Sequence, residues 1–156
     1  MRVHICAVGR LRRGPEKTLT DDYLERFARS GRGLGLGPAH VSEVEDRKGG
    51  GMAAEAALLR RAIPGGAVLC TLDERGKRLT SPQFADALAA WRDAGHRDLA
   101  LLIGGADGLE PSLRAEASLS LSFGAMVWPH MLVRAMLAEQ LYRAATILAG
   151  SPYHRD

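Results

Sequence analysis

The sequence has few cysteines and no long apolar run, and both shortages restrict the kind of protein it encodes. Only Cys6 and Cys70 occur among the 156 residues, and each lies inside a short apolar segment. Buried free thiols in a reducing compartment fit this usage better than a disulfide framework does, so we expect a cytoplasmic protein. The apolar segments are much shorter than the roughly 20 residues that cross a bilayer, so we expect no membrane-spanning helix.

Patterns typical of metal sites, tandem repeats and disorder are also missing. Neither cysteine has histidine or cysteine neighbours at the spacing of a metal site, so no metal is expected. Hydrophobic residues make up 46% of the chain and charged residues 25%, which is typical of a globular protein. The chain shows no internal repeat and no linker, and its length predicts one domain over residues 1–156. The N-terminus has a short apolar segment that arginines soon follow, and this pattern predicts a first strand rather than a signal peptide.

Positive charge is concentrated near the start of the chain. The net charge is +3, yet the first 32 residues alone hold eight Lys or Arg against four acidic residues. Arg10, Arg12 and Arg13 directly follow the first apolar run, in a loop that Gly14 and Pro15 end. Such a cluster attracts phosphate-rich partners, so the loop predicts binding of nucleic acid or another polyanion. A solvated basic surface without a partner is the alternative interpretation.

Short apolar runs alternate with helical patterns along the chain. Strands are predicted over residues 3–8, 40–44, 67–72 and 99–103, with at least one more within 119–128. Helices are predicted over residues 15–30, 52–63, 82–95, 111–117 and 130–149. This alternation predicts an α/β fold with three layers around a mostly parallel sheet.

A glycine-rich motif follows the predicted strand at residues 99–103. The run LLIGGADGLEP places Gly104 and Gly105 at the end of that strand and Gly108 three residues later. Glycine lets the backbone approach a ligand closely, and open α/β sheets bind ligands beyond the carboxyl ends of their strands. A tight turn would use the same residues, so the motif alone leaves both interpretations open.

Four segments carry side chains that are more typical of a site than of a scaffold. They are residues 71–77, residues 103–109, residues 121–130, and the polar face of the last helix together with the tail SPYHRD. Three of them follow predicted strands. Because the carboxyl ends of parallel strands lie at one edge of a sheet, these segments can converge on one pocket.

Taken together, these segments resemble one family, the bacterial SPOUT-superfamily methyltransferases that modify a pseudouridine of large-subunit ribosomal RNA at N3. The resemblance covers essentially the whole chain. It rests on five segments in the same order: VHICAVGRL, TLDERGKRLTS, LLIGGADGL, FGAMVWPHMLVRAMLAEQLYRA and PYHRD. It implies a deep trefoil knot near the C-terminus, which chain-connection rules would argue against, and it also implies a homodimer.

The resemblance further implies that S-adenosylmethionine binds in the knotted loops. By matched position, the cofactor contacts would be Leu72, Gly104, Phe123, Gly124, Ala125, Met126, Val127 and Trp128. Gly104 would allow close approach, and apolar side chains would enclose the adenine. On interior preference alone, the large side chains of Phe123, Met126 and Trp128 would instead be core residues.

Methylation at N3 needs the imide proton to leave and the nitrogen to align with an activated methyl group. The candidate residues for this chemistry are His130, Arg134, Tyr142, Arg143, Tyr153, His154 and Arg155. The positive end of a helix dipole favours a neutral His130 that can act as a base, although a capping or surface histidine is equally compatible. Arg134 could hold an RNA phosphate or pair with Glu139 or another carboxylate. The resemblance implies that the tail helps to form the active site, in its own chain or against the partner subunit; a disordered tail is the alternative.

The leading interpretation is an RNA methyltransferase that acts on the assembled ribosome or large subunit, with Arg10, Arg12 and Arg13 contacting RNA. Two alternatives remain. A dinucleotide-dependent oxidoreductase would use the IGGADG loop, but its glycine spacing and late position do not fit that motif. A non-catalytic, ribosome-associated RNA-binding protein would keep the fold without the chemistry.

Overall fold

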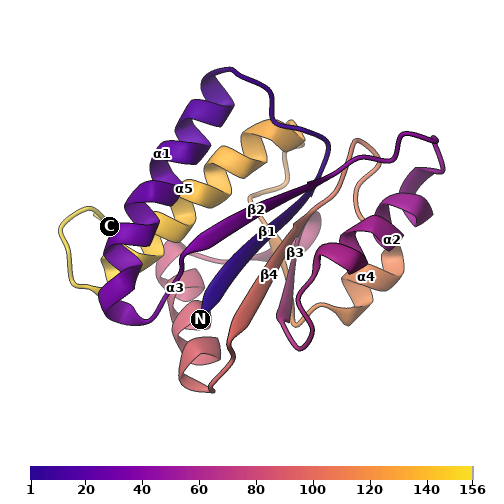
Figure 1. The fold of residues 1–156 in the computed structure, drawn as a ribbon. Helices are drawn as coiled ribbons and strands as arrows, with labels where there is room; N and C mark the ends of the chain where they lie inside the picture. The colour runs from indigo at the N-terminus through magenta and orange to yellow at the C-terminus, as the bar shows by residue number, and fades with distance from the viewer. Residues whose placement is uncertain (156) are drawn as a thin grey trace.

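The computed structural model describes residues 1–155, and five parallel strands form one sheet at its centre (Figure 1). The order across the sheet is β2-β1-β4-β3-β5, and every pairing is parallel. The strands are β1 (Arg2–Val8), β2 (Ala39–Val44), β3 (Val68–Arg78), β4 (Asp98–Ile103) and β5 (Leu119–Ser122). The predicted α/β class with a parallel sheet is therefore confirmed.

Helices cover both faces of this sheet and complete the three layers. One face carries α1 (Pro15–Gly31), α3 (Ser81–Asp93) and α5 (His130–Leu148), and the other carries α2 (Gly51–Ala62) and α4 (Pro111–Glu116) (Figure 1). A short 3₁₀ helix, η1 (Arg32–Leu34), follows α1. The helices begin where the sequence signals predicted them. In α3, for example, Thr80 and Gln83 form a reciprocal capping box.

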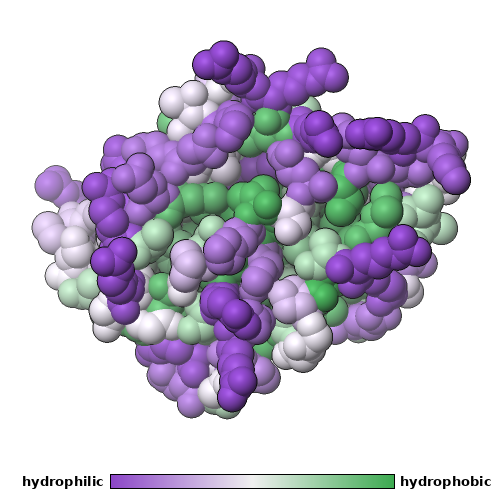
Figure 2. Space-filling view, viewed as in Figure 1, coloured by the Kyte–Doolittle hydropathy of each residue, from purple (hydrophilic) through white to green (hydrophobic). Residues whose placement is uncertain are grey.

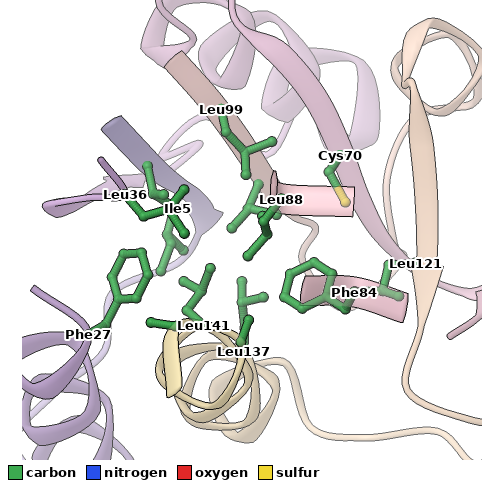
Figure 3. Close-up of a cluster of buried hydrophobic side chains, with 14 of the residues drawn as sticks. Ile5, Phe27, Leu36, Cys70, Phe84, Leu88, Leu99, Leu121, Leu137 and Leu141 are labelled. Atoms are coloured by element: carbon green, nitrogen blue, oxygen red, sulfur yellow. The ribbon is translucent and has the colours of Figure 1, made fainter. Parts of the chain in front are cut away.

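The central strands are buried on both faces because their side chains alternate between two apolar clusters. In β1, Val3, Ile5 and Ala7 belong to the cluster beneath α1, α3 and α5, part of which Figure 3 shows. Cys6 and Val8 point to the smaller cluster beneath α2 and α4. The same alternation in β4 explains why these strands read as continuous apolar runs in the sequence.

Strand β3 differs from its prediction, since it continues through the charged segment after Leu72 to Arg78. Its pairing with β5 breaks between Leu72 and Lys77 and then resumes. Gly76 permits this extension, because an added Cβ atom there would lie 2.6 Å from the backbone oxygen of Ser120. Close backbone contact, rather than an apolar pattern, therefore sets the length of this strand.

Both cysteines are buried free thiols, as predicted. Burial raises the pKa of the Cys6 thiol to about 11 and that of Cys70 to about 12. Within residues 1–155, no helix combines the length and the apolar character that crossing a membrane requires. In the same range, no group of histidine, cysteine and acidic side chains is arranged to hold a metal ion. The trefoil knot stays a prediction from the family resemblance.

Candidate active site

A cavity of about 210 Å³ opens at the carboxyl edge of the sheet, where the predicted segments converge. It is lined by residues 72–75 of β3, by the glycine-rich loop at residues 103–108, by residues 123–124 and 126–128, and by His130. Every residue that the sequence suggested for cofactor contact, except Ala125, lies in this lining. The prediction that the segments at the strand ends converge on one pocket is therefore confirmed.

The segment 123–128 forms the outer wall of the cavity. Its start is fixed by Ser122, whose hydroxyl lies 3.0 Å from the backbone oxygen of Glu74 and accepts a hydrogen bond from the Gly124 amide at 3.1 Å. Beyond that anchor the side chains of Met126 and Val127 are 71% and 80% exposed, and Trp128 is 39% exposed. The alternative that Met126 and Trp128 are core residues is therefore wrong. Phe123 is half-buried and packs against the core.

Gly104 lines the cavity, but its lack of a side chain serves the turn. An added Cβ atom would lie 2.5 Å from the carbonyl carbon of Gly108 and 2.8 Å from the amide nitrogen of Leu109. Gly105 and Gly108 form an isolated antiparallel bridge that closes this turn. Any side chain at Gly104 would therefore disrupt the loop itself. This differs from the expectation that Gly104 is glycine to admit a ligand.

His130 is the first residue of α5 and contributes to the cavity rim. In the described part of the chain, no side chain caps this helix, so the capping interpretation of His130 is wrong. Partial burial lowers the pKa of His130 below its usual value, and the positive charge of Arg134 lowers it further. Both effects favour the neutral imidazole, which is the form that can accept a proton.

Arg134 lies one turn later and is almost completely buried, with 1% of its side chain exposed. It donates to the carboxylate of Glu43 at 2.7 Å, to the backbone oxygen of Val8 at 2.7 Å and to that of Gly9 at 2.6 Å. Its carboxylate partner is thus on β2 and is not Glu139. Because its guanidinium is buried against protein groups, we correct the expectation that Arg134 holds an RNA phosphate.

The tail is ordered through its contacts with the far end of α5. The ring of Tyr153 lies 4.6 Å from that of Tyr142, centre to centre, and its hydroxyl donates to Glu139 at 3.1 Å. The Arg143 guanidinium lies 4.8 Å from the centre of the Tyr153 ring and 3.2 Å from Nδ1 of His154. The alternative of a disordered tail is therefore wrong for residues 151–154. Arg155 is exposed.

The catalytic candidates fall into two groups at opposite ends of α5. His130 and Arg134 lie at its start, beside the cavity, whereas Tyr142 and Arg143 lie near its end with the tail. At about 1.5 Å per residue, His130 and Arg143 are roughly 20 Å apart along the helix. Figure 1 shows the yellow segment that follows α5 beside α1, away from the start of α5. Within one chain, the described tail residues 151–155 do not line the cavity.

A second, larger hollow of about 570 Å³ connects these two regions. It shares Phe123 and Gly124 with the cavity and reaches Tyr23 and Glu139 at the tail. Apolar side chains supply much of its lining, among them Leu19, which is 45% exposed on α1. Sequence analysis missed this groove, although the apolar stripe of α1 carried the signal.

The predicted RNA-contacting arginines lie in the loop between β1 and α1, at the same edge of the sheet. Arg10, Arg12 and Arg13 are exposed, and Arg10 lies 3.5 Å from Glu45. Glu45 also lies 3.9 Å from Arg47, which the sequence analysis did not single out. Figure 2 shows hydrophilic side chains gathered along the top of the molecule, where Figure 1 places the loop between β1 and α1. Two loops thus bring positive charge to the side of the molecule on which the cavity opens.

Comparisons with known proteins agree with this architecture. A family model described as a predicted SPOUT methyltransferase matches residues 1–154. Proteins named ribosomal RNA large subunit methyltransferase H from Ruegeria pomeroyi and Dinoroseobacter shibae are 78% and 74% identical over 155 residues, and each alignment covers 99% of both chains. The structure of a probable methylase family protein from Haemophilus influenzae is similar in fold, with a TM-score of 0.51, 11% identity and coverage of 99% of this chain and 70% of that one. The chain belongs to the SPOUT methyltransferase family.

Proposed function

We propose that this protein transfers a methyl group from S-adenosylmethionine to N3 of a pseudouridine in large-subunit ribosomal RNA. Its substrate would be the assembled ribosome or large subunit in the cytoplasm. One observation carries the proposal. Leu72, Gly104 and the segment 123–128, which are far apart in sequence, line one cavity at the carboxyl edge of the sheet. The names of the highly identical relatives support the class of substrate.

The cavity suits the chemical groups of the proposed cofactor. Leu72, Phe123 and Met126 offer apolar surface for an adenine ring, and the backbone of residues 103–108 offers amide and carbonyl groups for its edge. Glu74 and Asp107 add acidic side chains to the lining, which favour a ligand that carries a sulfonium and an ammonium group, whereas the Asp73 carboxylate is already paired with Arg75 at 2.9 Å. When bound, the cofactor supplies an activated methyl group.

His130 is the proposed proton acceptor. The N3–H of the base is a weakly acidic imide, and the nitrogen becomes nucleophilic when this proton moves to the imidazole. The lowered pKa keeps His130 in the neutral form that this step requires. The remaining requirement is alignment of nitrogen and methyl group, which the cavity walls around both reactants would supply.

We also propose a homodimer in which the tail of one chain completes the cavity of the other. Two observations support this arrangement. The tail contacts Glu139 and Arg143, roughly 14 and 20 Å from His130 along its own helix, and the cavity wall leaves Met126 and Val127 largely exposed. A second copy that covers this wall and the adjoining groove would bury them and bring Tyr153, His154 and Arg155 to the reacting base.

The direct test is mass spectrometry of ribosomal RNA after incubation of ribosomes with the purified protein and isotope-labelled cofactor. The proposal expects one labelled methyl group on N3 of a single pseudouridine. Cofactor binding, measured by calorimetry, is expected without binding of NAD. Ribosome binding without methyl incorporation would contradict the proposal and would identify a non-catalytic RNA-binding protein.

A further inference from the structure

A carboxylate outside the cavity connects the arginine loop to the start of α5. Glu43, near the end of β2, uses one oxygen, Oε1, to accept two hydrogen bonds. The Leu11 amide donates one at 2.7 Å, and the Arg134 guanidinium donates the other at 2.7 Å. Leu11 lies between Arg10 and Arg12, so one oxygen holds both the loop and the helix that carries His130.

Arg134 completes the connection from the other side. Its second terminal nitrogen donates to the carbonyl oxygens of Val8 and Gly9, where β1 enters the loop. Glu43 is 28% exposed and Arg134 only 1%, so this ion pair is shielded from water on the arginine side. Charge-assisted hydrogen bonds of this kind are about twice as strong as neutral ones. The loop between residues 8 and 11 is therefore attached at three backbone groups.

From this geometry we infer that Glu43 is a positioning residue for RNA recognition. With Arg134, it fixes the backbone of the arginine loop so that Arg10, Arg12 and Arg13 face the RNA in one arrangement relative to the cavity. The inference rests on the proposed function, because it assigns a ribosomal RNA partner to that loop. It gives a negatively charged residue a favourable role in binding a polyanion, which simple charge counting would not predict.

The test compares Glu43→Ala and Glu43→Gln with the unaltered protein and with Glu25→Gln. Glu25 is a suitable control because its carboxylate, 70% exposed on α1, pairs only at the surface, with Arg29 at 3.5 Å. Steady-state methylation of large ribosomal subunits gives KM and kcat, and calorimetry gives the cofactor affinity. Amide hydrogen exchange at Leu11, measured by NMR, reports on the loop without any substrate.

Positioning predicts that Glu43→Ala raises KM for the subunits about tenfold, because an ionic hydrogen bond is lost, with little change in cofactor affinity. Glu43→Gln is expected to raise KM less, since its amide oxygen still accepts. Amide hydrogen exchange at Leu11 is expected to become faster in both variants, and more so in Glu43→Ala than in Glu43→Gln. Glu25→Gln is expected to leave all of these values unchanged.

Removing a negative charge near RNA would by itself tighten ribosome binding and lower KM, whereas loss of positioning raises KM. The two explanations therefore predict opposite changes in KM. A KM equal to or below that of the unaltered protein in the folded variants, or unchanged exchange at Leu11, would overturn the inference. If Glu43→Ala fails to fold, KM and the exchange at Leu11 in Glu43→Gln test the inference by the same criteria. If the unaltered protein methylates no ribosomal RNA, the proposed function fails, while exchange at Leu11 still tests the attachment of the loop.

Discussion

The hydroxyl of Tyr153 donates a hydrogen bond to the carboxylate of Glu139 at 3.1 Å. This bond fixes the tail on the last helix, together with the close contact between the rings of Tyr153 and Tyr142. Desolvation raises the pKa of Tyr153, and its neighbours Tyr23 and Glu139 raise it further, so its hydroxyl stays protonated and remains a donor. The tail is thus held in a defined place on α5, away from the cavity of its own chain.

Deletion of residues 153–156 is expected to reduce methyl transfer to background while cofactor binding is largely kept. The physical reason is that the tail lies away from the cofactor cavity of its own chain but, in the proposed dimer, faces the reacting base. Single-turnover methylation and calorimetry measure the two properties separately. Full activity of the truncated protein would show that the tail has no part in the reaction.

Mixed dimers test whether the tail acts on the partner chain. A chain without residues 153–156 and a chain with His130→Ala are each expected to be inactive in homodimers. In a mixed dimer, the truncated chain keeps His130 and receives the tail of the other, so one complete site is expected to form. Recovery of methylation on co-expression supports a tail that acts on the site of the partner chain. No recovery would show that the tail acts with His130 of its own chain.

His130→Asn is expected to slow single-turnover methylation and to remove a step from its pH profile. The folded pKa of His130 is lowered, so its neutral, proton-accepting form persists down to pH values below about 6.5. The rate of the unaltered protein should therefore fall only when the pH drops through that lowered pKa. An identical profile for the variant would remove His130 as the proton acceptor.

Replacement of Arg10, Arg12 and Arg13 by glutamine is expected to weaken ribosome binding and to flatten its dependence on salt. Each phosphate contact that is lost lowers the slope of log affinity against log salt by roughly 0.7–0.9. Binding titrations at several salt concentrations measure this slope. Arg29→Gln removes an exposed arginine elsewhere, one that already pairs with Glu25, and should leave the slope unchanged. An unaltered slope in the triple variant would assign RNA binding to another surface.

Gly104→Ala is expected to lower the free energy of unfolding by about 1–3 kcal/mol and to abolish cofactor binding, because the new Cβ atom would overlap backbone that cannot move aside. Gly33→Ala is the matched control, since an added Cβ atom there has no neighbour within 4 Å. Chemical denaturation and calorimetry check both variants. Full stability together with lost binding in Gly104→Ala would indicate direct crowding of the ligand and not a broken turn.

Asp98 is expected to make stability depend on acid pH. Its carboxylate accepts two hydrogen bonds from Arg2 at 2.8 Å and lies 2.7 Å from the His4 ring, and these groups lower its pKa to about 2. The unfolded value is about 3.9, so this stabilisation is complete above that pH and is lost as the pH falls towards 2. Denaturant unfolding of Asp98→Asn should show a weaker decline over this interval. Equal declines would show that Asp98 titrates alike in both states.

The sequence alone determined most of the secondary structure and the location of the site. Strands with both faces buried read as apolar runs such as residues 99–103, and Pro15, Thr80 and Pro129 mark helix starts, because local backbone preferences act over a few residues. Strand order was not readable, but the shared edge of parallel strands was enough to predict that Leu72, Gly104 and residues 123–128 converge.

Only the tertiary structure decided which roles individual side chains play, because those roles depend on neighbours far along the chain. Arg134 pairs with Glu43, 91 positions earlier, and so holds a loop rather than meeting RNA. Gly104 is constrained by the backbone of Gly108, and Gly76 lets β3 continue beside β5 despite its charged sequence. Periodicity and motif spacing record local preference and burial. They do not record which buried donor meets which acceptor, and that pairing assigns Arg134 to the loop. The length of α5 separates His130 from the tail of its own chain.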